Sequence, residues 1–212
     1  MRLIVFRFSA LCMFALAVAG CATQQPYADD AAIAAVSYRD SGPASLTLYT
    51  MVNNRTGKGG HSALLINASE RVIFDPAGSF HADIVPERND VLFGITPAVE
   101  QAYRSAHARS TFHVDMQTIE VSPAQAEAAY RVALHNGGVA GGLCSNAVAN
   151  LLRQVPGFES LGPTLYPTRL AEEFGRLPGV TFEQYFEDDS ADLQDGLTQG
   201  NAALNRLAKT GG

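Results

Sequence analysis

The feature that most constrains the fold is a series of short strand-like segments separated by brief polar loops. Each segment is rich in residues that favour strands and is bounded by glycine, proline, asparagine or serine. The segments are 46–52, 61–66, 71–75 and 111–121. Segment 61–66 is apolar on both faces, which predicts a central strand, and the short turn after it predicts a hairpin with segment 71–75. The chain is therefore expected to build an antiparallel sheet.

Helices are predicted in the stretches between these strands and after them. Ser122 is a favourable N-cap with Pro123 at the first helical position, and the alanine-rich stretch that follows carries one apolar stripe at helical spacing. Further elements are expected as helices over 97–107, from Cys144 to about Pro156 and from about Pro167, and as a short strand over 180–186. The predicted fold class is α+β, an antiparallel sheet packed with helices.

The N-terminus has the pattern of a secretory signal peptide. Arg2 and Arg7 precede an apolar run over 8–19 that is too short to anchor in a bilayer. The run ends in the sequence Val-Ala-Gly-Cys over 18–21, which resembles the lipobox of bacterial lipoproteins and implies lipidation of Cys21. The lipid would hold the protein on a membrane of the cell envelope, with the periplasmic side of the outer membrane expected. The alternative is an ordinary signal cut nearby, which would leave Cys21 able to pair with Cys144.

Composition divides the chain into four parts. Residues 1–20 form the expected signal peptide, 21–45 a tether, 46–187 a single domain, and 188–212 an acidic tail expected to be disordered. Two of the 15 Lys and Arg residues leave with the signal peptide, so the mature chain has 13 basic against 21 acidic residues, a net charge of −8. This charge disfavours nucleic acid or anionic lipid headgroups as the main partner.

Cys144 is the candidate nucleophile. It follows a glycine-rich turn over 137–143 and begins a predicted helix, where the macrodipole lowers the pKa of a thiol. With the signal peptide removed and Cys21 lipidated, it is the one thiol that remains. A structural or partner-linking role for this leftover cysteine is the alternative. No metal or cofactor is expected, because the chain lacks the paired cysteine or histidine spacings of a zinc site.

His61 is the candidate base that would take the proton of the thiol. It follows two glycines at the start of an apolar strand, where an imidazole has no packing purpose without a partner. The other histidines are interpreted as surface or capping residues; they are His81, His107, His113 and His135.

Asp75 is the candidate for orienting the imidazole. It shares a face with His61 only if paired residues of the hairpin sum to an even number, as a three-residue loop gives. With any other register, His81, Glu70 or a backbone group would have to orient the ring. The alternative without a catalytic role is that Asp75 only begins a turn before Pro76.

These motifs resemble the circularly permuted branch of the NlpC-type papain-like cysteine hydrolases, which includes relatives of lecithin retinol acyltransferase. The resemblance is carried by the sequence GHSALLI over 60–66 and by CSNAV over 144–148. In that branch the histidine precedes the cysteine, as here. The resemblance implies a permuted papain-like fold, with Cys144 as nucleophile, His61 as base and Asp75 as orienting residue. The aspartate is a departure, because relatives more often have histidine or another polar residue there.

The function implied is acyl transfer by a membrane-anchored hydrolase or acyltransferase. Thiolate Cys144 would attack an amide or ester carbonyl, His61 would protonate the leaving group, and main-chain N–H groups at the helix start would bind the oxyanion. The expected substrate is a peptidoglycan peptide or a lipid or other acyl compound. The alternative is a non-catalytic lipoprotein that binds a cell-wall fragment or a lipid in the same cleft.

Overall fold

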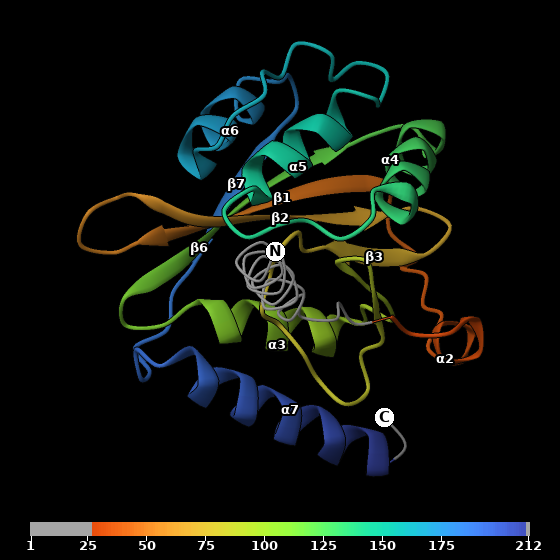
Figure 1. Ribbon diagram of the computed structural model, residues 1–212, viewed down its shortest axis with the longest axis vertical. Helices are drawn as coiled ribbons and strands as arrows, with labels where there is room; N and C mark the ends of the chain where they lie inside the picture. The colour runs from red at the N-terminus through yellow and green to blue at the C-terminus, as the bar shows by residue number, and fades with distance from the viewer. Residues whose placement is uncertain (1–26, 211–212) are drawn as a thin grey trace, which may run out of the picture.

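The computed structural model describes residues 27–210 and contains a seven-stranded antiparallel sheet (Figure 1). The strands are β1 (Ser45–Asn53), β2 (Gly59–Asn67), β3 (Arg71–Phe74), β4 (Glu87–Arg88), β5 (Val91–Leu92), β6 (Phe112–Glu120) and β7 (Thr181–Tyr185). Their order across the sheet is β4-β5-β3-β2-β1-β6-β7. The predicted class, α+β with an antiparallel sheet, is confirmed.

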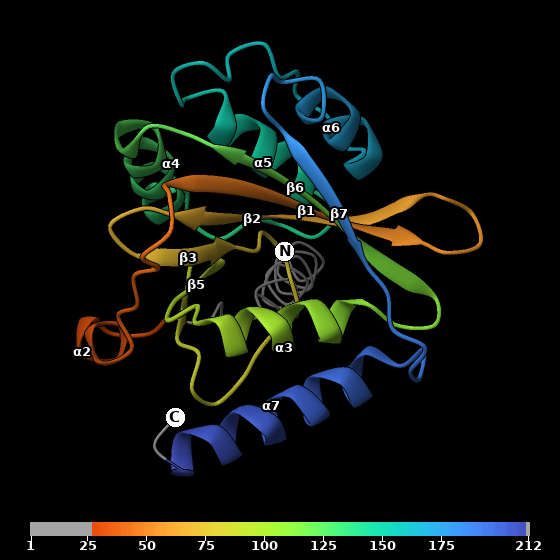
Figure 2. The ribbon, with the colours of Figure 1, turned by 180° about the vertical axis from the view of Figure 1, so that it is seen from behind.

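Helices cover both faces of the sheet (Figures 1 and 2). They are α2 (Asp30–Ala35), α3 (Pro97–His107), α4 (Pro123–His135), α5 (Cys144–Leu152), α6 (Pro167–Phe174) and α7 (Leu193–Thr210). α4, α5 and α6 pack on one face, and α3 and α7 lie on the other. Among the helices of residues 27–210, none is long and apolar enough to cross a membrane.

The central strand β2 supplies side chains to both layers of the core. Leu64 and Ile66 are buried in the cluster under α5, whereas Ala63 and Leu65 are buried in the cluster against α3. Successive side chains of a strand point to opposite faces, so an apolar run without alternation is stable only when both faces are covered. The prediction that this segment forms a central strand is therefore confirmed. The same alternation places His61 on the α3 side.

The described part of the expected tether, residues 27–44, is docked on the domain, so the prediction of a free linker is wrong for these residues. The Ala28 N–H donates to the Glu87 carbonyl at 2.8 Å, and Asp29 caps the short helix α2. Ile33 and Val36 then pack against the core. These two apolar side chains explain the docking, because they bury surface that a solvated linker would leave in water. Cys21 and the signal peptide lie outside the described residues.

The C-terminal segment is also ordered, contrary to the predicted disorder. α7 packs on α3 through Leu197 and Leu204, which are 2% and 3% exposed. Gly196 faces Ala106 of α3 closely enough that an added Cβ would lie 3.2 Å from its main chain. Glycine disfavours a helix in isolation, but here it permits the close helix packing that stabilises this segment.

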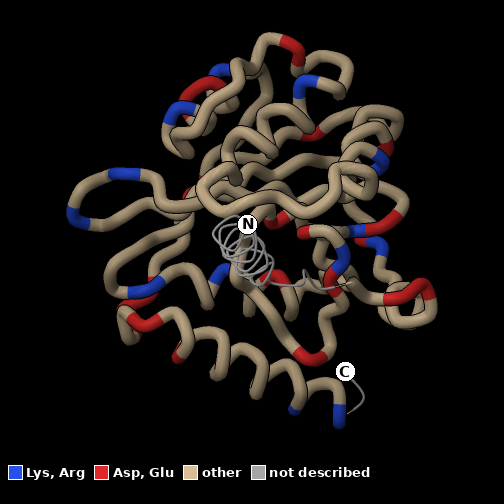
Figure 3. The backbone as a smooth tube through the Cα atoms, viewed as in Figure 1, with Lys and Arg blue, Asp and Glu red and all other residues tan. Residues whose placement is uncertain are grey.

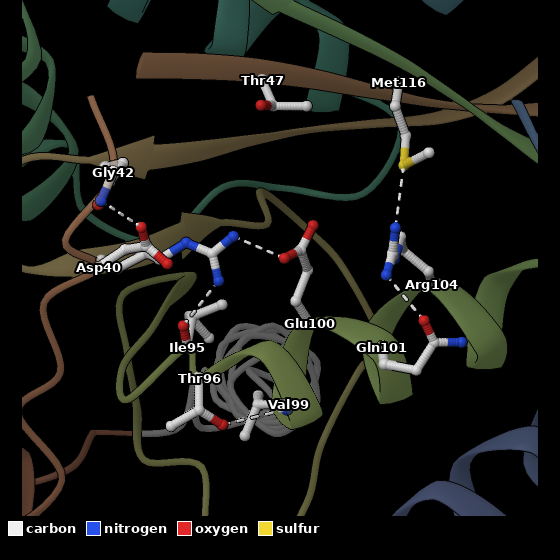
Figure 4. A network of polar contacts seen from close by, with 12 residues as sticks. Asp40, Gly42, Thr47, Ile95, Thr96, Val99, Glu100, Gln101, Arg104 and Met116 are labelled. Carbon is white, nitrogen blue, oxygen red and sulfur yellow. Dashed lines mark hydrogen bonds and ion pairs between the residues drawn. The ribbon is translucent and has the colours of Figure 1, made fainter. Parts of the chain in front are cut away.

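A partly buried polar network ties α3 to the sheet (Figure 4). Glu100 pairs with Arg71 of β3 at 2.6 Å and accepts a hydrogen bond from the Tyr49 hydroxyl of β1 at 2.7 Å. One turn further, Arg104 extends to Met116 Sδ on β6. These contacts fix the position of the helix that carries two residues of the site described below.

Candidate active site

The site lies at the free edge of β2. β3 ends at Phe74, which pairs with Leu64, so its pairing covers only residues 64–67 of β2. The edge that it leaves open is met by the start of α5, where the main chain of Ser62 acts on the Cys144 thiol and lowers its pKa. The hydroxyls of Ser62 and Ser145, both fully buried, lie 3.4 Å apart beside this contact. The early end of β3 is what allows a thiol from the α5 layer to reach β2.

His61 and Asp75 meet on the opposite face of the same edge. Asn67 pairs with Arg71, which leaves a loop of residues 68–70 and gives the even register that the sequence required. His61 Nε2 lies 2.7 Å from Asp75 Oδ1. Asp75 is not directly opposite His61, because the pairing of Leu64 with Phe74 places it past the end of β3 and nearer the level of Ala63. The ring orientation nevertheless leaves Nδ1 as the nitrogen free to exchange a proton with Cys144.

A tight turn holds the carboxylate of Asp75 in place. The Gly78 N–H donates to the Asp75 carbonyl at 2.9 Å, with Pro76 second and Ala77 third in the turn. Ala77 has φ 55°, a left-handed conformation that costs free energy in a residue other than glycine. A Cβ added to Gly78 would lie 1.8 Å from Asp75 Oδ2. Residue 78 must therefore be glycine, because any side chain there would collide with the carboxylate of Asp75.

Tyr103 of α3 is a second partner of Asp75 that sequence reasoning missed. Its hydroxyl donates to Asp75 Oδ1 at 2.7 Å, and the residue has no solvent exposure. The same carboxylate oxygen thus accepts from both Tyr103 and His61. Two donors on one buried oxygen fix its position and favour its charged form.

His107, interpreted from sequence as a surface or capping residue, is buried against the site. Its Nδ1–H donates to the Tyr103 carbonyl at 2.8 Å, and its ring stacks on that of His61 with centroids 6.1 Å apart. Burial lowers the pKa of His107, so this ring is neutral at pH 7. The prediction of a surface residue is wrong because α3 packs with this end facing the sheet, whereas the bond to the Tyr103 carbonyl at the end of α3 is a capping contact.

Asp90 joins the two halves of the site and was also not predicted. Its Oδ2 accepts from the Val139 N–H at 2.6 Å, and its main-chain carbonyl accepts from the Asp75 N–H at 2.8 Å. Val139 belongs to the loop over 136–143 that leads into α5, a stretch without charged residues (Figure 3). The available signal was the Asn89-Asp90 pair, since these residue types tolerate the left-handed turn seen here. Asp90 thereby holds the turn of Asp75 next to the loop of Cys144.

The pKa values of Cys144, His61 and Asp75 favour an ion pair between the Cys144 thiolate and the His61 imidazolium above about pH 7. Burial alone would raise the pKa of Cys144, but the hydrogen bond and charge of His61 bring it down to about 7. Burial alone would lower the pKa of His61, yet the charge and hydrogen bond of Asp75 raise it to about 10. The pKa of Asp75 is lowered, because the neighbouring His61 outweighs the opposing effect of burial. The thiolate and the imidazolium are thus the favoured forms between these two values.

The remaining histidines make contacts of other kinds. They are His81, which bonds within its own loop, His113, which bonds Asn54, and His135, which bonds the Arg131 carbonyl. Glu70, an alternative orienting residue, accepts from Ser37 instead. Within residues 27–210, no group of three or more His, Cys, Asp or Glu side chains is arranged to hold a metal ion.

Replacing Tyr103 with phenylalanine is expected to lower the rate at which an alkylating reagent labels Cys144 about 10-fold, because Asp75 loses one charge-assisted hydrogen bond. The loss should grow toward acid pH, since that bond helps to keep the pKa of Asp75 low. Tyr49→Phe is the matched control: Tyr49 is equally buried and packs 5.5 Å from Tyr103, but it donates to Glu100. Equal losses of labelling rate in both variants would argue against a positioning role for Tyr103.

Comparison of the chain with protein-family models, with curated proteins and with solved structures finds no match.

Proposed function

We propose that this protein is a cysteine hydrolase or acyltransferase that cleaves an amide or ester bond through a thioester on Cys144. The observation that carries the proposal is the chain of contacts from the Cys144 sulfur through His61 to Asp75 at the N-terminus of α5. A nucleophile, a base and a residue that orients the base are the three parts that covalent catalysis requires. The lowered pKa of Cys144 adds support, because an inert buried thiol has its pKa raised.

In the first half-reaction the thiolate of Cys144 attacks the carbonyl carbon of the substrate. No side chain caps the first turn of α5, so main-chain N–H groups of this turn are free to bind the oxyanion. His61 gives its Nδ1 proton to the leaving group as the carbon–nitrogen or carbon–oxygen bond breaks. In the second, water or another acceptor attacks the thioester, His61 takes the proton, and the sulfur leaves as thiolate.

The fold is proposed to be the permuted papain-like arrangement of the NlpC type. The support is the order of the parts: a histidine on a central strand, then a helix that begins with the cysteine, with the sheet antiparallel throughout. Lipidation at Cys21 would place the enzyme on a membrane of the cell envelope, near two classes of acyl compound, the peptides of peptidoglycan and lipids.

The pH dependence of catalysis should separate the roles of the two groups. For hydrolysis of an acyl p-nitroanilide, kcat/KM should rise through about pH 7 as Cys144 ionises and fall through about pH 10 as His61 loses its proton. For the matching p-nitrophenyl ester only the rising limb is expected, because p-nitrophenolate leaves without a proton. Both rates are measured against Cys144→Ala as background. Failure to hydrolyse either compound above that background would favour a non-catalytic binding lipoprotein.

A further inference from the structure

A cavity of about 300 Å³ opens beside His61 on the α3 side of the sheet. Its wall includes His61, whose side chain is 16% exposed, and His107, whose ring stacks on that of His61. Cys144 is a described residue but is not part of this wall. The cavity thus adjoins the proton donor of the site and not its nucleophile.

This position identifies which part of a substrate the cavity would receive. In acyl transfer the acyl group becomes bonded to the sulfur, while the leaving group takes its proton from the histidine. A cavity that touches His61 and not Cys144 therefore lies on the leaving-group side of the scissile bond. Its volume of about 300 Å³ holds about ten non-hydrogen atoms, if each takes the ~30 Å³ of a water molecule in the liquid.

The ionisable side chains of the wall already have partners within the protein. His61 is paired with Asp75 at 2.7 Å, and burial lowers the pKa of His107, so its ring is neutral at pH 7. Arg109 is 3% exposed, and its guanidinium contacts neighbouring main-chain carbonyls and the carboxylate of Asp189. The described residues of the wall include no other ionisable side chain. A charged substrate group would therefore lose its hydration in this cavity without gaining a partner.

The rest of the wall is uncharged and mostly apolar. Phe112 and Leu193 are its largest apolar side chains that are partly exposed, and Ala191 is exposed. Ala191 and Leu193 belong to the segment that leads into α7, and the Arg109 Nε–H holds this segment by donating to the Ser190 carbonyl at 2.7 Å. The cavity is thus formed before a substrate arrives, and a preformed apolar cavity binds an apolar group at a low cost in ordering.

We propose that this cavity binds the leaving group of the reaction and that this group is an uncharged apolar alcohol or amine of about ten non-hydrogen atoms or fewer. The proposal rests on the proposed function and narrows it to one class of ester and amide substrates. Cys144 Sγ bonds to the carbonyl carbon, the C–O or C–N bond breaks, and His61 protonates the departing oxygen or nitrogen. Water then attacks the thioester, its proton passes to His61, and the C–S bond breaks. The reaction needs no oxidant, reductant or co-substrate besides water.

The test compares three esters that share the acyl group of the p-nitrophenyl ester above and differ in the leaving alcohol: a methyl, a benzyl and a carboxymethyl ester. Release of each alcohol by the purified full-length protein is followed by mass spectrometry. Wild type should prefer the benzyl to the methyl ester by about 10- to 100-fold in kcat/KM, the usual effect of burying an aromatic side chain. The carboxymethyl ester should react no faster than the methyl ester, because its charge has no partner in the cavity.

Ala191→Phe should lose most of the preference for the benzyl ester, because the added ring occupies the same space. Ala202→Phe is the matched control: Ala202 is an exposed alanine of α7 that is not part of the wall, so this variant should keep the preference. The preference should be measured as the ratio of the two rates in each preparation, so that a general loss of activity does not affect it.

Equal rates on the benzyl and methyl esters, a faster reaction of the carboxymethyl ester, or the same preference in Ala191→Phe as in wild type would overturn the inference. Loss of the preference in both variants would overturn it too. If the p-nitrophenyl ester is hydrolysed in a reaction that depends on Cys144 but the benzyl ester is not, the inference fails and the proposed function stands. If neither ester is hydrolysed, both proposals fail.

Discussion

Replacement of Cys144 with alanine is expected to abolish hydrolysis, with a loss of about four orders of magnitude or more in kcat. The reason is that the other groups of the site act on the sulfur: His61 and the main chain of Ser62 lower its pKa, and Asp75 orients the imidazole. Without the sulfur these groups have no covalent intermediate to stabilise. Turnover of the acyl p-nitroanilide and mass-spectrometric detection of the acyl-enzyme give the measurement.

Cys144→Ser is the companion variant, since it keeps the size and position of the nucleophile but raises the pKa of the attacking group. It should be almost as inactive as Cys144→Ala and should show no burst of product. Both variants should fold, because Cys144 is outside the two clusters of the hydrophobic core and is 7% exposed. Substantial hydrolysis by folded Cys144→Ala would contradict the assignment of this residue as nucleophile.

Gly78→Ala is expected to damage the site through its effect on the carboxylate of Asp75. The added Cβ would lie 1.8 Å from Asp75 Oδ2, so the carboxylate must move away from His61. Overpacking of this kind costs about 1–3 kcal/mol of stability. In known catalytic triads, loss of the orienting carboxylate lowers kcat about 10²–10⁴-fold, and a loss of this size is expected here. Thermal unfolding and turnover of the same preparation separate the two effects.

Gly141→Ala is the control for this experiment. Gly141 precedes Cys144 by three residues, but a Cβ there has no atom within 4 Å, and its φ lies outside the left-handed region. Activity and stability should therefore stay close to those of wild type. If Gly141→Ala were as inactive as Gly78→Ala, the loss would have to come from a general effect of substitution near the site.

The strands and most helices could be predicted from the sequence because the patterns that indicate them are local. Alternation, N-caps and stop residues act within a few positions, and α3 and α4 begin at the prolines that predicted them. The two errors, the docked residues 27–44 and the ordered α7, both concern segments whose stability comes from tertiary packing. α7 contains Gly196 and Gly200, which lower helix propensity but fit against Ala102 and Ala106 of α3.

The site was predictable to the extent that it depends on chain geometry alone. His61 and Asp75 belong to one hairpin, so a loop length decides whether they share a face, and the three-residue loop placed them together. Tyr103 and Asp90 could not be found in this way. Their contacts with Asp75 form only when α3 and the β5 edge pack against the hairpin, and no local pattern specifies that packing.

The most direct test of the catalytic pair is the pH dependence of alkylation at Cys144 by iodoacetamide, in wild type and in His61→Ala. The rate is followed at the peptide that contains Cys144. In wild type the rate should follow a midpoint near pH 7, the value to which His61 lowers the pKa of the thiol. In His61→Ala the midpoint should move toward the ordinary thiol value of about 8.5, which makes labelling at pH 6 about 30-fold slower. The same slow profile in both proteins would contradict the existence of the pair.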